Sequence, residues 1–281
     1  MLREQTFTAS GLKLAAKVYG PDDGKPVLAM HGWLDNAATF DRLIPLLSPS
    51  LRIVAIDLPG HGLSEHRSED ATYSVPDAVV DVLNLIHTLG WKRFSIIGHS
   101  MGAAIGAVFA GTKPHLVDKL VLLEGLGPLP AEAHEAPERL ERAADEEQQP
   151  PSRTRLFTSL DDAASRVTQA VPMELSSAKI LLERGLKPVD GGLTWRTDPR
   201  LRGTTRLRLT EAHVAAFMKR IAAPTLVVLA DHGWPVPQEI IELRKSYIAQ
   251  LKTVPVVGRH HVHLDSPELV APHVTALLTP P

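Results

Sequence analysis

The segment from residue 94 to 111 constrains the fold more than any other part of this 281-residue chain. An apolar run, Phe94 to Ile97, leads directly into Gly98-His99-Ser100-Met101-Gly102, and the small-residue stretch Ala103 to Gly111 follows. A Gly-x-Ser-x-Gly turn between a strand and a helix holds its serine in a strained conformation, and the glycines let the backbone approach itself closely. We therefore expect Ser100 to project from a sharp turn as a nucleophile.

Strands and helices alternate on both sides of this turn. Apolar runs predict further buried strands at Val27 to Met30, Arg52 to Asp57, Lys119 to Leu123, Thr225 to Ala230 and Thr253 to Val257. The clearest crossover helix is Asp77 to Leu89, which Ser74 precedes and Gly90 closes. The alternation predicts an α/β fold with a mostly parallel sheet, helices on both faces, and chemistry at the carboxyl ends of the strands.

The alternation stops between residues 125 and 220. This segment has Pro-rich turns and amphipathic helices, including Ala178 to Arg184 and Glu211 to Arg220, but no long strand run. Ala131 to Glu147 is strongly acidic with little apolar periodicity, which is typical of a solvated helix or loop. We expect residues 1–124 and 221–281 to form the core and residues 125–220 to form an inserted helical cap.

A second glycine turn, His31-Gly32-Trp33, follows the predicted strand Val27 to Met30. Gly32 permits a sharp turn that presents the Trp33 N–H, and the start of the helix after Ser100 presents the Met101 N–H. Two converging N–H groups stabilise the oxyanion of acyl transfer, each by about 3 kcal/mol. We expect Trp33 and Met101 to form an oxyanion hole, and His31 to bond within its own loop.

These motifs together resemble the α/β-hydrolase superfamily. The resemblance covers nearly the whole core and is carried by His31-Gly32-Trp33, the loop Asp57 to Ser64, the turn at Ser100 and the late segment Gly258 to Pro267. More narrowly, the sequence is similar to the serine hydrolase-like subgroup in His31 to Asn36, in His260-His261 with His263, and in Asp190 to Arg200. The resemblance implies the α/β-hydrolase fold.

The family pattern implies that the catalytic base is His260, seven positions before Pro267. A neutral imidazole can take the serine proton and return it to the leaving group near neutral pH. His263 occupies a position where the family often has a second, supporting histidine. For His261 and His263 we favour local hydrogen bonding or packing.

The acid of the triad departs from the common family pattern. In most of the superfamily it follows the strand that is Thr225 to Ala230 here, but the matching position is Gly233. Two carboxylates could replace it: Glu124, after the strand Lys119 to Leu123, and Asp231. Some haloalkane dehalogenases carry a Glu after that earlier strand, and a triad acid is recognised by its geometry and role. We favour Glu124 over Asp231, and the alternative for either is a carboxylate that caps loop amides.

Composition and the nucleophile exclude several functions. The 30 Lys and Arg against 32 Asp and Glu, a formal net charge of −2, give no electrostatic reason to expect nucleic acid or an anionic membrane as a partner. The absence of cysteine excludes disulfides and thiolate metal sites. A serine at position 100 argues against dehalogenases and epoxide hydrolases of the superfamily, which use Asp there. No metal or organic cofactor is implied, and without an apolar leader a cytoplasmic location is expected.

We expect an esterase of small to medium carboxylic esters that acts as a monomer or homodimer on a small-molecule substrate. The predicted pocket residues are His31, Gly32, Trp195 and Trp234. A basic run, Arg200, Arg202, Arg206 and Arg208, is expected to be a solvated face. The alternatives are a thioesterase, a lactonase or a carbon–carbon hydrolase with the same triad, and a binding protein that has lost its acid at Gly233.

Overall fold

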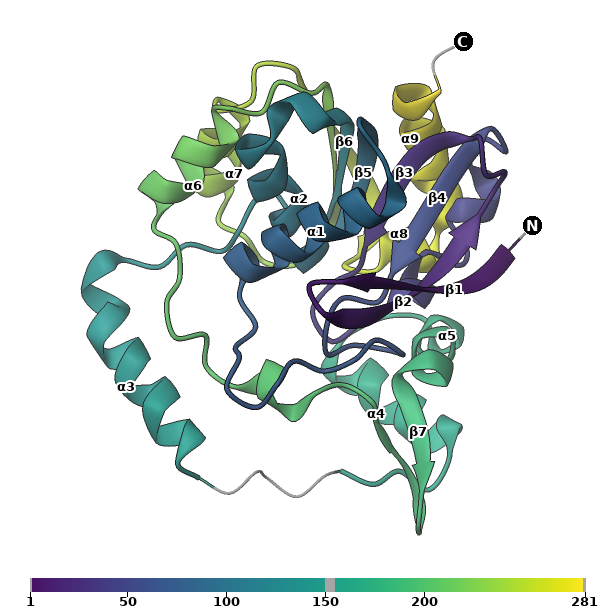
Figure 1. Ribbon diagram of the computed structural model, residues 1–281, viewed down its shortest axis with the longest axis vertical. Coiled ribbons are helices and arrows are strands. Elements are labelled where there is room, and N and C mark those ends of the chain that lie inside the picture. Colours follow the sequence, from purple (N-terminus) through teal and green to yellow (C-terminus); the bar gives the residue numbers. More distant parts are fainter. Residues whose placement is uncertain (1, 150–154, 280–281) are drawn as a thin grey trace.

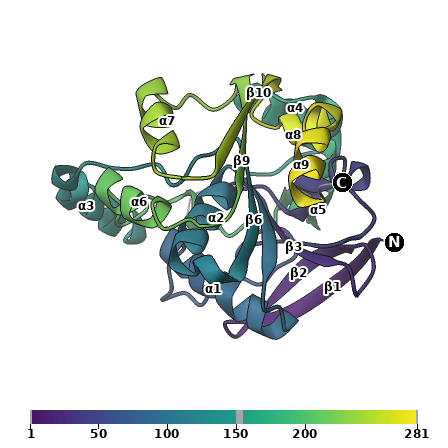
Figure 2. The ribbon, with the colours of Figure 1, turned by 90° about the horizontal axis from the view of Figure 1, so that it is seen from above.

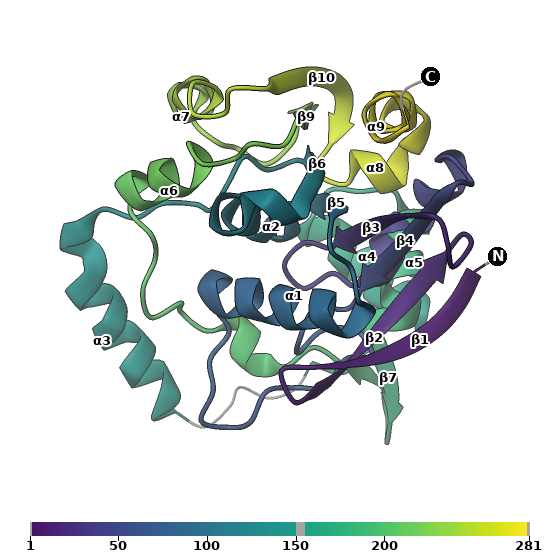
Figure 3. The same ribbon diagram turned by 45° about the horizontal axis from the view of Figure 1, so that its top comes forward.

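A computed structural model of the chain describes residues 2–149 and 155–279. Within these ranges, eight strands form one sheet in the order β1-β2-β4-β3-β5-β6-β9-β10, which Figure 3 shows from β1 and β2 at one edge to β9 and β10 at the other. Their bounds are Leu2–Ala9 (β1), Leu12–Tyr19 (β2), Lys25–Met30 (β3), Leu51–Ile56 (β4), Phe94–His99 (β5), Val117–Leu123 (β6), Thr225–His232 (β9) and Leu251–Arg259 (β10). All neighbours from β4 to β10 pair in parallel, while β1 with β2 and β2 with β4 are antiparallel. The predicted mostly parallel sheet is confirmed.

Helices cover both faces of the sheet, as Figure 2 shows. One face carries α1 (Val75–Leu89), α2 (Met101–Thr112) and α6 (Glu211–Met218), and α7 (Gln238–Lys245) follows β9. The other face carries α8 (Val262–Asp265), α9 (Ala271–Leu278) and the short 3₁₀ helices η1 (Ala37–Phe40) and η2 (Ile44–Leu46). Two apolar clusters, one on each side, form the core.

The crossover helix α1 begins two residues before its predicted start. Ser74 caps it by accepting a hydrogen bond from the Asp77 amide, and Pro76 lies in its first turn. Gly90 ends it in the left-handed region, at φ 67°. This pattern of a serine cap, an early proline and a closing glycine explains why the sequence predicts this helix well.

The hairpin of β1 and β2 was missing from the prediction. Side chains of β1 alternate between exposed and half-buried, so this strand lacks the continuous apolar run that marked the others. Its turn, Ser10-Gly11, has φ angles of 53° and 74°, the conformation that a two-residue hairpin requires. The alternation and the Ser-Gly turn together could have predicted the hairpin.

The chain between β6 and β9 contains the predicted helices together with a short hairpin. Its elements are α3 (Ala136–Glu147), α4 (Leu160–Ala170), α5 (Leu175–Gly185), β7 (Leu186–Val189), β8 (Gly192–Trp195), the 3₁₀ helices η4 (Ala133–Glu135) and η5 (Pro199–Arg202), and α6. Figure 1 shows α3 apart from α4, α5 and β7. A small apolar cluster around Phe157 and Leu182 joins α4 and α5 to Leu264 of α8. Val214 and Met218 of α6 pack with α2 in the core, and the cap boundary at residue 220 stays a prediction.

Two further 3₁₀ helices, η3 (Pro114–Leu116) and η6 (Pro267–Leu269), precede β6 and α9. In the part of the chain that the structure describes, no helix combines the length and the apolar character needed to cross a membrane.

Candidate active site

Ser100 lies in a strained turn between β5 and α2. Its φ of 51° and ψ of −110° are a conformation that a non-glycine residue rarely adopts. The flanking glycines make the turn possible, because a Cβ on Gly98 would overlap the Gly102 carbonyl and a Cβ on Gly102 would overlap the Met30 carbonyl. The sequence folds here into a turn that presents a serine at the carboxyl end of β5.

Two backbone amides at this edge are available to a ligand. Met101 is the first residue of α2, and Trp33 lies in the turn after β3. Neither N–H donates to any acceptor within the described ranges. A free N–H group at a helix start next to a nucleophile, as at Met101, suits the stabilisation of a developing negative charge, and a role for the Trp33 amide stays a prediction.

His260 and Glu124 form a pair beside this turn. Nδ1 of His260 lies 3.3 Å from Oε2 of Glu124, whose side chain is 3 % exposed. Glu124 is itself held in place, since Oε1 accepts from the Ala230 amide and Oε2 accepts from the Trp234 amide at 3.2 Å. Its φ of 54° is again left-handed. A buried carboxylate on Nδ1 favours the imidazole tautomer with the proton on Nδ1 and a lone pair on Nε2.

Asp231, the other candidate acid, lies elsewhere on the strand end. Its Oδ1 accepts from the Gly258 amide at 2.9 Å, and its side chain is 49 % exposed. That amide holds the pKa of Asp231 below its ordinary value. Asp231 makes no hydrogen bond to His260 in the described part of the chain, so its geometry is that of a carboxylate capping a loop amide.

The remaining reactive atoms are free. Ser100 Oγ and His260 Nε2 make no hydrogen bond to any described residue. Contacts between nucleophile and base are often long in structures without substrate and tighten when substrate binds. The exposed indole of Trp234 lies over His260 with ring centroids 5.5 Å apart, so an apolar surface adjoins the pair.

The other predicted pocket residues are His31, Gly32 and Trp195. His31 has no exposed surface; its Nε2 accepts from the Leu58 amide and its Nδ1 donates to the Gly32 carbonyl, so we do not retain it as a pocket residue. Gly32 is buried beside His99 in the same turn. Trp195 packs edge-on against Phe157 in the insertion, at 5.4 Å between centroids. A place for Trp195 in the pocket stays a prediction.

The basic run between β6 and β9 is exposed, as expected, and two of its four arginines pair with carboxylates. Arg200 binds Asp198 and four backbone carbonyls between Arg67 and Ala71. Arg206 pairs with Glu147 of α3. Arg202 stacks over the Trp195 ring at 5.3 Å. Arg200 thus ties two loops together, and Arg206 ties its loop to α3.

Sequence reasoning missed a cluster of buried titratable side chains beside the pair of His260 and Glu124. Asp35 and His99 join His261 and His263 there, and the His99 and His263 ring centroids lie 4.2 Å apart. His263 Nε2 bonds the Thr39 hydroxyl at 2.9 Å, which matches the local role that we favoured. His99 is the variable residue of the Gly-x-Ser-x-Gly motif, so its position alone gave no signal.

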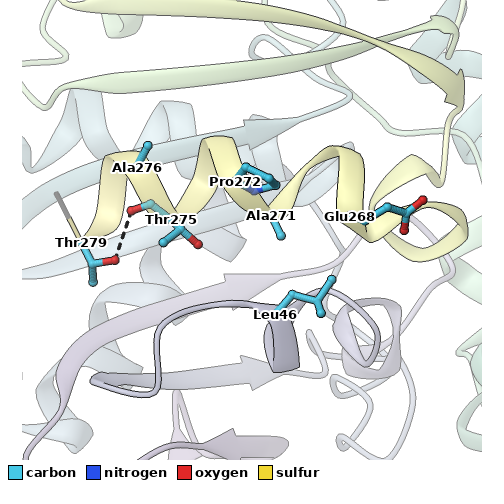
Figure 4. A pocket seen from close by; sticks show the side chains of 7 residues that line it. All are labelled: Leu46, Glu268, Ala271, Pro272, Thr275, Ala276 and Thr279. Atoms are coloured by element: carbon cyan, nitrogen blue, oxygen red, sulfur yellow. Dashed lines mark hydrogen bonds between the residues drawn. The ribbon is translucent and has the colours of Figure 1, made fainter. Parts of the chain in front are cut away.

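The two described depressions of the surface lie away from this site. Figure 4 shows one, about 530 Å³, where Leu46 of η2 faces α9. The other, about 510 Å³, is lined by Arg155, Arg166, Gln169 and Ala170. Neither includes Ser100, His260 or Glu124.

The fold, the strained serine turn and the histidine–carboxylate pair together define an α/β hydrolase. The chain belongs to this family: a sequence model of the alpha/beta hydrolase fold matches residues 25–267. It is 37% identical over 280 residues to a serine hydrolase-like protein of Danio rerio, covering 95% of this chain and 86% of that protein.

Solved structures agree with this assignment. A hypothetical protein from Pseudomonas aeruginosa PAO1 is 39% identical with a TM-score of 0.91, covering 97% of this chain and 98% of the other. The thioesterase domain from the curacin biosynthetic pathway is 28% identical with a TM-score of 0.87, covering 98% and 99%. The chain is therefore an α/β hydrolase similar to serine hydrolase-like proteins.

Proposed function

We propose that this hydrolase cleaves small to medium carboxylic esters through an acyl-enzyme. Ser100 is the nucleophile, His260 the general base, and Glu124 the acid that orients His260. The observation that carries the proposal is the 3.3 Å contact between His260 Nδ1 and the buried Glu124 carboxylate, next to a serine in a strained turn. Nucleophile, base and orienting acid are the parts that acyl transfer requires.

The first half-reaction forms the acyl-enzyme. Ser100 Oγ attacks the ester carbonyl carbon while its proton passes to His260 Nε2, and the carbonyl oxygen becomes an oxyanion facing the Trp33 and Met101 amides. Glu124 stabilises the imidazolium through Nδ1. The carbon–oxygen bond to the alcohol then breaks, and His260 gives its proton to the departing alkoxide.

The second half-reaction releases the acid. Water attacks the acyl carbon and gives a proton to His260 Nε2, which passes it to Ser100 Oγ as the acyl–serine bond breaks. The exposed rings of Trp33 and Trp234 support an apolar acyl or alcohol group at this edge.

A thioester is the second candidate substrate. The chain's similarity to the thioesterase domain covers nearly its full length, and the same triad can release a thiol in place of an alcohol. A matched pair of substrates with the same acyl group, one an oxygen ester and one a thioester, separates the two functions by the ratio of their kcat/KM values.

The first experiment is intact-mass analysis after exposure to a serine-directed phosphonate. We expect one adduct on the wild type and none on Ser100→Ala or His260→Ala, because the first variant lacks the nucleophilic oxygen and the second lacks the base that activates it. Asp231→Asn is the control and should be labelled like the wild type. A folded wild type without an adduct would contradict the proposal and favour a binding protein.

A further inference from the structure

Residues close in sequence to Trp33, Ser100 and His260 meet in one buried cluster. Asp35 lies two positions after Trp33, His99 precedes Ser100, and His261 follows His260. The side chains of His99, His261 and Asp35 are 1 %, 5 % and 11 % exposed. The cluster therefore joins the loop of the oxyanion amide, the serine turn and the loop of the base.

His99 holds the backbone of His260. Its Nε2 lies 2.9 Å from the His260 carbonyl oxygen, and Nε2 must carry the proton because a carbonyl only accepts. In neutral His99, Nδ1 then has a bare lone pair, which faces Asp35 Oδ2 at 3.4 Å. Burial lowers the pKa of His99 to about 3, so the ring is neutral at pH 7. The Asp35 carboxylate therefore takes its hydrogen bond from another side chain.

His261 provides that hydrogen bond. Its Nε2 lies 3.1 Å from Oδ2 and 3.4 Å from Oδ1 of Asp35. Burial opposes both charges, yet Asp35 raises the pKa of His261, and His261 together with His99 holds the pKa of Asp35 well below its ordinary value. The result is a buried histidine–carboxylate pair one residue from the proposed base.

Gly32 lets the oxyanion loop lie against this pair. A Cβ at residue 32 would lie 2.9 Å from His99 Nδ1 and 3.1 Å from Asp35 Oδ2. Contacts that short would displace either the loop or the cluster. Because Gly32 has no side chain, the loop that carries the Trp33 amide packs directly against Asp35 and His99.

A metal ion is the alternative occupant of this cluster. Asp35, His99 and His261 each offer a ligand atom, and these atoms lie within 4.8 Å of one another. Such a set of nitrogen and oxygen ligands would suit Zn²⁺. The histidine–carboxylate pair is favoured because His261 Nε2 already bonds Asp35. Metal binding is therefore an outcome of the test below.

We propose that Asp35 is a positioning residue of this hydrolase, which fixes the His260 and Trp33 loops relative to Ser100 through His261 and His99. Asp35 touches no reacting atom. The inference rests on the proposed function. Without the carboxylate, the contacts of residue 35 with His261 and His99 weaken and the loop of the base is held less firmly, so turnover falls while substrate binding stays similar.

The test compares Asp35→Asn with Asp41→Asn in the whole chain. Asp35→Asn keeps the volume and removes the charge. Asp41 is a matched control, since its carboxylate accepts from Lys17 and Tyr19 and makes no contact with the histidines in the described ranges. For a chromogenic ester we expect Asp35→Asn to lower kcat about 100-fold, the size of effect that a 1 Å misplacement can have, with KM within about threefold. Phosphonate labelling of Ser100 should slow in parallel, and Asp41→Asn should match the wild type.

His99 gives a second measurement. The side-chain amide of His99→Gln can still donate to the His260 carbonyl, whereas His99→Ala removes that bond. We expect His99→Gln to keep about tenfold more kcat than His99→Ala, because only the former retains the hydrogen bond that positions the loop.

Three results would overturn the inference. An unchanged kcat in folded Asp35→Asn, or a loss that appears only in KM, would show that Asp35 does not position the base. One Zn²⁺ per chain bound by the wild type and lost in Asp35→Asn would replace the histidine–carboxylate pair by a metal site. A folded wild type that the phosphonate does not label would instead refute the proposed function, and this inference with it.

Discussion

Gly233 lies directly against the carboxylate of Glu124, so that a Cβ on residue 233 would overlap Oε2. Residue 233 is the position where most of the superfamily carries its acid, and the neighbouring strand end carries the carboxylate here. Because β6 and β9 are parallel neighbours, both positions lie at the same edge of the sheet. A side chain at 233 and the carboxylate of Glu124 therefore compete for the same space, which is what the proposed role of Glu124 as the acid requires.

Removing the charge of Glu124 should slow turnover without unfolding the chain. We expect Glu124→Gln to lower kcat by about 10⁴, as the loss of an orienting triad carboxylate can. Steady-state kinetics on an ester measure this. Asp231→Asn is the matched control and should stay near the wild-type rate, because Asp231 bonds the Gly258 amide instead of His260. A collapse in Asp231→Asn with a normal rate in Glu124→Gln would reverse the assignment.

The pairing of Glu124 with Gly233 predicts a rescue. Gly233→Asp alone should lose activity, because its side chain meets the Glu124 carboxylate. The double variant Glu124→Gly with Gly233→Asp moves the acid to the common family position and places glycine where φ is 54°. We expect its kcat to exceed that of either single variant, so the two effects should be strongly non-additive in a double-mutant cycle. Additive losses would show that the two positions act independently.

The parts of the site that sequence could predict are those fixed by local backbone geometry. The serine turn needs small residues at Gly98 and Gly102, and this requirement is visible in five consecutive letters. The family resemblance favoured Glu124 over Asp231, but local residues could not decide between them, because the choice depends on which carboxylate reaches His260 across 136 residues of chain. The link from His99 to the His260 carbonyl spans 161 residues and was missed for the same reason.

Arg244 should be important for stability. Its side chain is 3 % exposed and binds Glu211 at 2.7 Å and the carbonyls of Leu126 and Pro128, so it ties α7 to α6 and to the chain that follows β6. We expect Arg244→Leu to lower the free energy of unfolding by about 3–5 kcal/mol, because the removal of one partner leaves a largely buried carboxylate and two carbonyls unpaired. Urea unfolding measures the change. Arg3→Leu, which breaks an exposed pair with Asp22, is the control and should cost under about 1 kcal/mol.

Buried neutral histidines predict a loss of stability in mild acid. Burial is the largest cause that lowers the pKa of His31 to about 4 and of His61 to about 3. In the unfolded chain both pKa values return to about 6.5, so between pH 6.5 and pH 4 the unfolded state binds protons that the native state does not. Stability is therefore complete above pH 6.5 and falls as the pH drops, by about 1.4 kcal/mol per pH unit for each such group.

Urea unfolding at pH 7.5, 5.5 and 4.5 measures this slope, and His61→Gln tests its source. His61 donates from Nδ1 to the Pro59 carbonyl at 3.0 Å, a bond that an amide can replace without binding a proton. We expect the variant to lose less stability than the wild type between pH 6.5 and pH 4. Equal slopes in the two proteins would mean that His61 already takes up a proton in the native state, in conflict with its burial.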